Sequence, residues 1–522
     1  MPVVEVTRWG AYNRRHSLTP PMNFETAQTP SPTPAQAASL PDGMPLYVDL
    51  DGTLVRSDTL HESMLLLLRL SPWYLLRMEW WLLGGKAAFK RQVARHVCPD
   101  AANLPYHGPF LAWLRAEYAA GRPLVLATAA DARIAQAVAN HLGLFGAVLA
   151  SNAADDGVNL SSGHKREAIE QHARAHGDGR YAYAGNSRDD LAVWAGAVAA
   201  VAVDTPPAVQ RQLRRTHPAP HTFDSPAATG RDWIKAIRLK QWSKNALLFV
   251  PLLAAHDWTL AAWGQLVWAF VSFGLCASAT YLINDLLDLP NDRRHAHKRY
   301  RPLAAARIAI APAVGVLALL LPAALALAAW LSPLFLGALV LYTGITLAYS
   351  FALKRIALLD VLVLSGLYTL RLVAGAAAAG LDLSNWLLAI SLFLFLGLAL
   401  VKRCAELEEV LLDTESDTAR GRGYHQDDLP SLRVMGVASG FLTVMVLALY
   451  IDSQNGRELY AQPEWLWGVA PLLLWWIMRI WLKTGRRELH GEDPLQFALH
   501  DRFSWYTLAG MGVLGALATW GL

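Results

Sequence analysis

The chain has 522 residues, of which 54% are hydrophobic and only 17% are charged. This composition excludes an ordinary soluble globular protein, because so much apolar surface needs lipid around it. The 46 basic and 42 acidic residues give a formal net charge of +4, which excludes a nucleic-acid-binding protein that neutralises many phosphates. Three cysteines, Cys98, Cys276 and Cys404, lie far apart. They exclude a disulfide framework and a thiolate metal site, and they fit a reducing compartment.

Residues 1–40 are rich in Pro, Thr, Ala, Ser and Gln, without a sustained apolar run. Such a segment cannot bury enough surface to offset the entropy of ordering, so we expect a disordered tail. It also lacks the basic start, apolar stretch and cleavage site of a secretory signal peptide. The domain that follows is therefore expected in the cytoplasm.

Residues 45–205 alternate short apolar runs with amphipathic, Ala-rich stretches. The runs that we interpret as strands are 46–49, 123–127, 147–149, 181–184 and 198–203. Strands separated by helical patterns predict an α/β fold in which helices wrap a parallel sheet.

Residues 60–95 form an insertion between the first two strands, with tryptophans and arginines among its leucines. Its charges argue against a membrane span, which leaves two interpretations: a helical cap on the sheet, or an amphipathic patch lying on the bilayer surface. Residues 206–231 contain several prolines and predict a linker.

Residues 232–522 form the second predicted domain, with about nine apolar segments, several close to the ~20 residues that a spanning helix needs. The segments are 244–260, 262–284, 307–330, 333–351, 357–379, 386–403, 430–451, 464–483 and 504–521. If the first one starts in the cytoplasm, nearly all basic loops lie on the side of the N-terminal domain, as the positive-inside rule requires. We therefore expect an all-α, multi-pass bundle in the inner (cytoplasmic) membrane, with its active site on the cytoplasmic side.

Asp49 and Asp51 directly follow the first predicted strand, in the sequence Asp-Leu-Asp-Gly-Thr. Open parallel sheets bind ligands at the carboxyl ends of their strands. One carboxylate can attack phosphorus while the other donates a proton to the leaving oxygen, with Mg²⁺ offsetting the negative charge. The motif alone also occurs in turns and calcium loops.

Three later motifs strengthen this interpretation. Thr128 ends the second strand, Lys165 opens a helix, and Gly-Asn-Ser-Arg-Asp-Asp at 185–190 ends another strand. With these motifs in order, the region resembles the haloacid dehalogenase (HAD) phosphatase superfamily over about 160 residues. The resemblance implies a Rossmann-type sheet with a small helical cap at 60–95. It also implies an aspartyl-phosphate on Asp49, acid/base catalysis by Asp51, and phosphoryl contacts from Thr128 and Lys165.

The resemblance further implies a Mg²⁺ site with the ligands Asp49, Asp51, Asn186 and Asp190. Asn186 departs from the family pattern, which usually has an acid there, and so lowers the negative charge around the metal. An amide oxygen can still coordinate Mg²⁺ directly or through water. The alternative is a degenerate HAD fold that serves as a regulatory or docking module.

Asn284, Asp285, Asp288 and Asp292 mark the end of the second apolar segment. Residues three and four apart share a helix face, so the oxygens of the first three converge. Carboxylates entering a membrane need cations nearby, and acids without an internal basic partner suit Mg²⁺ bound to a diphosphate. The alternative is a polar helix end in water, for which so many acids and amides are unusual.

Basic residues follow this motif along the chain: Lys298, Arg299, Arg301, Lys354 and Arg371. Such groups can hold phosphate oxygens that the metal leaves exposed. The alternative is that positive residues orient every membrane protein, which accounts for most of Arg355, Arg403 and Arg487. It does not explain Arg371, which lies inside the fifth segment. We expect Arg371 to face a polar cavity near Asp360.

The Asn-Asp-x-x-Asp-x-x-x-Asp motif, with about nine helices, resembles the UbiA superfamily of intramembrane prenyltransferases over the last ~280 residues. The resemblance implies a helical bundle with a polar cavity open to the cytoplasmic side. Pro290 departs from it and predicts a bend just before Asp292, which allows Asp292 to leave the metal face. Leu364, four residues after Asp360, leaves the second aspartate motif of aromatic prenyltransferases incomplete.

Four stretches look like one branch of that superfamily, the polyprenyl-phosphate phosphoribosyltransferases. They are Gln-Trp-Ser-Lys-Asn at 241–245, Lys-Arg-Tyr-Arg-Pro at 298–302, the segment 349–354 and Gly-Arg-Gly-Tyr at 421–424. They add Lys244 and Arg422 to the candidate phosphate-binding residues. Enzymes of this branch transfer 5-phosphoribose from phosphoribosyl diphosphate to a lipid phosphate. In both branches Mg²⁺ and cationic side chains stabilise the departing diphosphate.

The fusion favours phosphoribosyl transfer, because its product keeps a 5'-phosphate that a tethered phosphatase could remove. We therefore predict a bifunctional membrane enzyme, with transfer at Asp285 and Asp288 and hydrolysis at Asp49 and Asp51. Its expected partners are the bilayer, a polyprenyl phosphate, and phosphoribosyl diphosphate or an isoprenyl diphosphate. The alternatives are isoprenyl transfer to an aromatic or other small acceptor, and a non-catalytic membrane scaffold or transporter.

Overall fold

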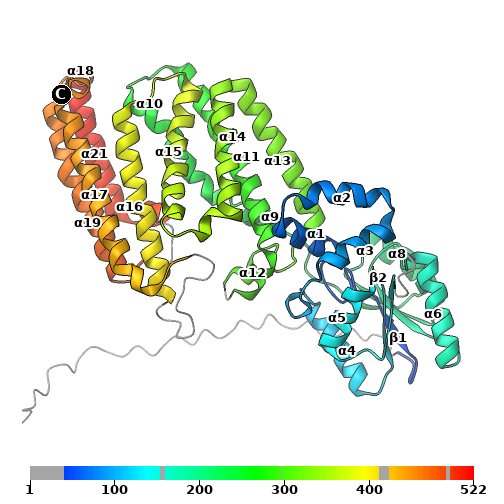
Figure 1. Ribbon diagram of the computed structural model, residues 1–522. Helices are drawn as coiled ribbons and strands as arrows, with labels where there is room; N and C mark the ends of the chain where they lie inside the picture. The colour runs from blue at the N-terminus through cyan, green and yellow to red at the C-terminus, as the bar shows by residue number, and fades with distance from the viewer. Residues whose placement is uncertain (1–39, 153–158, 296, 411–422, 490–493, 522) are drawn as a thin grey trace, which may run out of the picture.

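The computed structural model describes residues 40–152, 159–295, 297–410, 423–489 and 494–521 (Figure 1). The predicted tail falls outside these ranges apart from Leu40, and so does the candidate residue Arg422. Figure 1 shows two parts, a sheet covered by helices and a bundle of long helices.

The first part contains a six-stranded sheet in the order β3-β2-β1-β4-β5-β6, with every neighbouring pair parallel. Its strands are β1 Leu46–Val48, β2 Leu124–Asp131, β3 Ala147–Ser151, β4 Ala182–Gly185, β5 Ala199–Val203 and β6 His221–Phe223. Alternate residues of β1 enter two different cores: Leu46 and Val48 join one, and Tyr47 joins the other. Because helices bury both faces, β1, β4 and β5 are made almost entirely of apolar, Gly and Tyr residues, as parallel strands usually are.

Helices from different parts of the chain cover the two faces. α4 (Gly108–Ala119) and α5 (Ala132–Leu142) contribute to the core on the side of Leu46. α6 (Ser162–His176), α7 (Leu191–Trp194) and α8 (Pro207–Thr216) contribute to the core on the side of Tyr47. The predicted parallel sheet wrapped by helices is therefore present.

The predicted linker at 206–231 is largely structured. It contains α8 and the edge strand β6, and α9 (Gly230–Ala236) begins inside it. Proline is favourable in the first helical turn, where its missing N–H has no partner in any case, and Pro207 stands there in α8. Pro207 therefore marks a helix start, and the role of residues 206–231 as a linker stays a prediction.

The insertion at 60–95 is helical. It contains α1 (Thr59–Leu70), α2 (Tyr74–Leu83) and α3 (Lys86–His96). Only Met78 of α2 is buried, whereas Trp73, Leu76, Trp80 and Leu83 are 75%, 59%, 77% and 86% exposed. Their spacing places these four apolar side chains along one stripe of the helix. The three helices pack on one another and also present an uncovered apolar surface. We call them the cap, and their role as a HAD-type cap stays a prediction.

Seven helices of the described residues are long and apolar enough to cross a membrane. They are α11 Leu260–Leu287, α13 Ile310–Leu331, α14 Pro333–Phe351, α15 Leu359–Ala379, α16 Asn385–Val410, α17 Leu429–Asp452 together with η5 (Gln426–Asp428), and α19 Val469–Gly485 together with η6 (Pro463–Gly468). The last predicted segment forms α21, Arg502–Trp520. The shorter helices are η1 Ala101–Asn103, α12 Leu289–Arg294, η3 Lys298–Tyr300, η4 Leu353–Arg355, η5 Gln426–Asp428, α18 Gln454–Leu459, η6 Pro463–Gly468 and α20 Pro494–His500.

The first predicted spanning segment, 244–260, does not form a long helix. It folds as the 3-10 helix η2 (Leu239–Phe249) followed by the short α10 (Val250–Ala254). Leu248 and Leu252 are buried against α11, α14 and α15 in one apolar core. A Cβ on Gly375 of α15 would lie 2.1 Å from the carbonyl oxygen of Leu248, so only glycine permits this approach. The segment is a buried insertion in the bundle rather than a span.

Candidate functional site

The acidic motif lies where α11 ends. Asn284 and Asp285 belong to its last turn, Asp288 follows it, and Asp292 lies on α12. The helix breaks at Asp288, in agreement with the bend expected from Pro290. Asp292 nevertheless stays with the cluster and is only 4% exposed. The expectation that the bend frees Asp292 from this face is therefore wrong, because a basic residue ties it back.

Arg301 is that residue, since its Nη1 donates to Asp292 Oδ2 at 2.6 Å and to Asp285 Oδ1 at 3.2 Å. Arg238 also donates to Asp285, and Lys354 Nζ lies 3.3 Å from Asp288 Oδ2. The acids are thus neutralised by cations from three separate segments. Carboxylates at this depth need such compensation.

Arg238 was not among the predicted residues. Its backbone adopts a left-handed conformation with φ +52°, which is strained for a residue with a side chain and is found at functional sites. The only sequence signal was a basic residue shortly before the Gln-Trp-Ser-Lys-Asn stretch.

A cavity of about 280 Å³ connects this motif to the predicted phosphate-binding residues. Its polar lining includes Arg238, Lys244, Asn284, Asp285, Asp288, Asp292, Lys298, Arg301, Lys354 and Arg371. The side-chain oxygen of Asn284 is buried without a hydrogen-bond partner. An orphaned amide oxygen beside carboxylates is a donor set that Mg²⁺ accepts, so these residues fit a divalent cation with water and phosphate oxygens as further ligands. Among the described residues, no group of three or more acids, histidines or cysteines is arranged to hold a metal ion.

Arg371 lines the same cavity, as expected for a charge inside a spanning helix. It donates to the Leu367 carbonyl at 2.7 Å and to the Tyr342 hydroxyl at 3.0 Å, and its guanidinium lies over the rings of Tyr342 and Phe273. It does not lie near Asp360, so that expectation is wrong. The two residues are eleven positions apart on one helix, and a rise of about 1.5 Å per residue separates them by about 16 Å.

Asp360 instead pairs with Arg403, whose Nε lies 2.8 Å from Asp360 Oδ2, and both side chains are fully buried. The Tyr424 hydroxyl also donates to Asp360. Arg403 had been attributed to membrane orientation, but it serves here as the partner of a buried acid. Nothing in the sequence distinguished it from the other basic residues at helix ends.

The sheet has a second charged cluster at the carboxyl ends of β1 and β4. Lys165 Nζ on α6 lies 3.0 Å from Asp49 Oδ1 and 3.2 Å from Asp190 Oδ1. Tyr183, a residue that the sequence analysis missed, accepts a hydrogen bond from the same amine at 3.0 Å. Burial alone would lower the pKa of Lys165, but Asp49 and Asp190 outweigh it and raise that pKa. Lys165 therefore stays charged and bridges two carboxylates.

Asp190 does not fit the metal-ligand role predicted for it. Its Oδ2 accepts from the amides of Asn186 and Ser187 at 3.1 and 2.9 Å and from the Ser187 hydroxyl at 2.8 Å. Its Oδ1 is taken by Lys165 and Tyr183. A carboxylate with this many donors has no oxygen left for a cation. Asp190 instead shapes the loop that carries Asn186. The side-chain amide of Asn186 lies close to Gly52, since a Cβ added to Gly52 would fall 2.1 Å from Asn186 Nδ2.

Thr128 is fully buried in β2, and its Oγ1 accepts from the amide of Ala130 at 3.0 Å. Asp51 accepts from the amide of Thr59, the first residue of α1, at 2.7 Å. Burial, with Asp190 adding to it, raises the pKa of Asp49 to about 6 against the effect of Lys165. Burial and the nearby Asp58 raise the pKa of Asp51 to about 7. Asp51 can therefore exchange a proton near neutral pH.

Lys90 was also missed by the sequence analysis. It extends from α3 of the cap and donates to the Ala129 carbonyl at 2.7 Å, beside the end of β2. Burial lowers its pKa, while Asp51 and Asp58 act in the opposite direction. The cap thus supplies a cation to the edge of the sheet where Asp49 and Asp51 lie.

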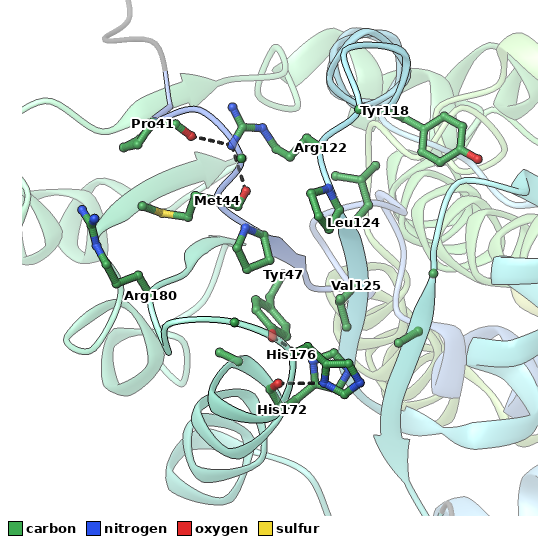
Figure 2. Close-up of a pocket in the computed structure, with 18 of the residues that line it drawn as sticks. Pro41, Met44, Tyr47, Tyr118, Arg122, Leu124, Val125, His172, His176 and Arg180 are labelled. Carbon is green, nitrogen blue, oxygen red and sulfur yellow. Dashed lines mark hydrogen bonds between the residues drawn. The ribbon is translucent and has the colours of Figure 1, made fainter.

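A larger cavity, of about 1030 Å³, lies elsewhere, at the amino ends of the strands. Figure 2 shows Arg122 directed at the carbonyls of Pro41 and Met44, with Tyr47 and His172 on another wall. It contains none of the predicted site residues. Arg122 already pairs with Glu117 and donates to three backbone carbonyls, so the size of this cavity alone does not make it a site.

The membrane half of the chain is similar to known proteins. The model of the UbiA prenyltransferase family matches residues 246–499. Decaprenyl-phosphate phosphoribosyltransferase from Mycobacterium tuberculosis is 39% identical over 295 residues, which cover 55% of this chain and 94% of that protein. The uncharacterized protein y4nM of Sinorhizobium fredii is 38% identical over 470 residues, 89% of each chain. That match is longer than the membrane half and so extends into the sheet domain.

The solved structure of a UbiA homolog from Archaeoglobus fulgidus bound to DMAPP and Mg²⁺ covers 54% of this chain and 99% of its own chain, with 17% identity and a TM-score of 0.40. The family match and the apolar helices identify a multi-pass membrane protein. Through its membrane half, the chain belongs to the UbiA prenyltransferase family, in which its relatives include decaprenyl-phosphate phosphoribosyltransferases.

Proposed function

We propose that the chain is a bifunctional enzyme that transfers 5-phosphoribose from phosphoribosyl diphosphate to a polyprenyl phosphate and then removes the 5'-phosphate of the product. The observation that carries the first step is the cavity at the end of α11, where an acidic motif faces Arg238, Arg301 and Lys354. The identity of 39% to phosphoribosyltransferases over 94% of their length supports the choice of donor.

In the transfer step, an oxygen of the lipid phosphate forms a bond to the anomeric carbon of the ribose. The bond from that carbon to the diphosphate breaks, and the diphosphate leaves with the electron pair. Arg301, Lys354 and Arg238 are placed to stabilise the charge of the leaving group, since cations fixed in advance cost no reorganisation during the reaction. Mg²⁺, when bound near Asn284 and Asp288, would neutralise the diphosphate.

The lipid acceptor would reach this cavity from the bilayer, and we place the cavity mouth on the cytoplasmic side of the inner membrane. The basic loops near the motif support that orientation under the positive-inside rule. The ring contacts of Arg371 leave its charge next to the cavity, where it can attract the lipid phosphate.

The second step would take place at the sheet, where Asp49 attacks phosphorus and the sugar oxygen leaves with a proton from Asp51. Water then attacks the aspartyl-phosphate, Asp51 accepts its proton, and inorganic phosphate is released. Lys165 supports this role because it holds Asp49 at 3.0 Å and can neutralise phosphoryl oxygens. The pKa of about 7 for Asp51 suits both proton transfers.

The main alternative is isoprenyl transfer to an aromatic or other small acceptor, which needs the same acidic motif. It leaves no phosphate ester for the sheet domain to hydrolyse. The full chain in detergent with Mg²⁺ should be offered labelled phosphoribosyl diphosphate with a polyprenyl phosphate, and separately an allylic diphosphate with aromatic acids. We expect lipid-linked label only in the first mixture. Transfer only in the second would contradict the proposal, and turnover in neither would favour a scaffold.

A further inference from the structure

Helix α1 of the cap joins the sheet domain to the acidic motif of the bundle (Figure 1). Glu62 accepts from Arg293 at 2.6 and 3.1 Å in a forked ion pair, and the two side chains are 4% and 10% exposed. Arg293 directly follows Asp292. Leu65, one turn further along α1, packs against the apolar cluster that contains Leu282 and Leu286 of α11. The end of α1 is thereby fixed beside the mouth of the transferase cavity.

A second cavity, of about 600 Å³, opens at this junction. It shares Asn284, Asp288, Asp292, Lys298 and Lys354 with the first cavity. Its remaining charged walls are Arg294, Arg355 and, from α1 of the sheet domain, Arg69. The two cavities are therefore adjacent, and one of them is completed by a residue from the other domain.

The cations of the second cavity are not all compensated. Lys354 pairs with Asp288, and Arg294 pairs with Asp100 at 2.7 Å. Within the described ranges, the side chains of Arg69, Lys298 and Arg355 form no ion pair. Three uncompensated cations around one cavity attract a multiply charged anion, and arginine is suited to forked contacts with phosphate.

We propose that this second cavity binds a phosphate monoester, the terminal phosphate of the sugar donor, and that Arg69 is a specificity-determining residue for it. The inference rests on the proposed transferase function. A donor with a diphosphate and a monophosphate on one ring can place one group in each adjacent cavity. The phosphate of the lipid acceptor fits less well, because its chain must stay in the bilayer while this cavity is lined mostly by polar and charged side chains, with Arg69 from the sheet domain among them.

The arrangement gives the sheet domain a part in the transfer step itself. The first residue of α1, Thr59, donates its amide to Asp51 at 2.7 Å, and Arg69 stands near the other end of the same helix. One helix therefore contributes to the phosphatase site and to the donor site. A transferase that requires the donor's monophosphate would make only products that the phosphatase can use.

The test uses the full chain with Arg69→Gln and Arg69→Lys, and Arg77→Gln as the matched control, since Arg77 lies on α2 over the Tyr74 ring, outside the cavity. Transfer is measured while donor and acceptor concentrations are varied separately. A lost charged hydrogen bond should raise the KM for phosphoribosyl diphosphate by about 10- to 100-fold. We expect an unchanged KM for polyprenyl phosphate, partial recovery in Arg69→Lys, and no effect of Arg77→Gln. A rise only in the acceptor KM would identify the lipid phosphate as the ligand and overturn the proposal.

Direct binding of ribose 5-phosphate, measured by calorimetry, separates this inference from the proposed function. If the wild type transfers no phosphoribose but binds ribose 5-phosphate, and Arg69→Gln weakens that binding by at least about 10-fold, the site stands and the proposed function fails. Equal binding by both proteins, or none by either, overturns the site. Thermal unfolding of each variant identifies a loss that comes from misfolding, and Arg69→Lys then decides the outcome.

Discussion

The two acidic sites of this chain are neutralised in different ways. In the sheet domain, a single amine, Lys165, bridges Asp49 and Asp190, and all three follow strand ends or open a helix beside them. In the bundle, Asp285 and Asp292 share Arg301, and cations also come from Arg238 and Lys354 on other segments. The first site is therefore set by local chain geometry, whereas the second depends on how distant segments pack. Substitutions at each site should separate the two activities.

The largest effect is expected for Asp49→Asn, which replaces the proposed nucleophile by a neutral amide of similar shape. Phosphate release should fall by at least about 10³-fold, because losing a nucleophile removes most of the catalytic effect. Transfer should be unchanged. The measurement is release of inorganic phosphate alongside formation of the lipid-linked sugar phosphate. Continued phosphate release in the variant would show that Asp49 is not the nucleophile.

The converse change is Asp288→Asn at the end of α11. It removes a carboxylate that faces the cavity and leaves Lys354 without its partner. We expect transfer to fall by about 100-fold or more, a typical loss when an electrostatic stabiliser is removed. Hydrolysis of a phosphate monoester by the sheet domain should continue. If both activities fell together while the protein remained folded, the two sites would not be independent.

The contrast between the sites also explains what could be predicted from sequence. Asp49, Lys165 and Asp190 were found because each belongs to a short motif at a strand or helix end, and the parallel sheet brings such ends to one edge. The acidic motif from Asn284 to Asp292 was predicted because its residues are spaced three and four apart, as on one face of a helix. The partners Arg238, Arg403 and Glu62 were not found, because pairs 43 to 231 positions apart depend on packing that no local pattern encodes. Their separations follow from the contacts of Arg238 with Asp285, Arg403 with Asp360 and Glu62 with Arg293.

Arg403→Met tests whether the buried pair inside the bundle is structural. The change leaves Asp360 buried with only Tyr424 as a partner. Breaking one side of a buried pair typically costs about 3–5 kcal/mol. The control is the double change Arg403→Met with Asp360→Leu, which removes both charges and should recover most of the stability. Thermal unfolding in detergent measures both proteins, and equal midpoints for the wild type and Arg403→Met would contradict a structural role.

The apolar stripe of α2 predicts that this face of the sheet domain contacts the bilayer. Leu83 is 86% exposed there, whereas Tyr118 on α4 is 50% exposed in the same domain. An exposed Trp- and Leu-rich helix face inserts into the membrane interface. A nitroxide label at Leu83→Cys in the reconstituted full chain, with Cys98 replaced by Ser, should be accessible to oxygen and shielded from a polar relaxation agent. A label at Tyr118→Cys should show the reverse. The same response at both positions would mean that α2 stays in water.

The smallest effect is expected at Asp204, which attaches the former linker region to the sheet. Its Oδ1 accepts from the Ser225 amide at 2.5 Å and lies 3.6 Å from His107 Nε2. Burial acts to raise the pKa of Asp204, but the nearby His107 ring and the hydrogen bond from Ser225 outweigh it and lower that pKa. Because the folded state holds the proton less tightly than the unfolded state, this stabilisation is complete above about pH 4 and is lost as the pH falls toward the folded pKa.

Asp204→Asn should therefore lower stability by about 1 kcal/mol at pH 7, a modest value because the side chain is partly exposed. Unfolding of the two proteins between pH 7 and pH 3 should show the gap closing at the acid end, and a gap that widened instead would mean that Asp204 is not bound in its charged form.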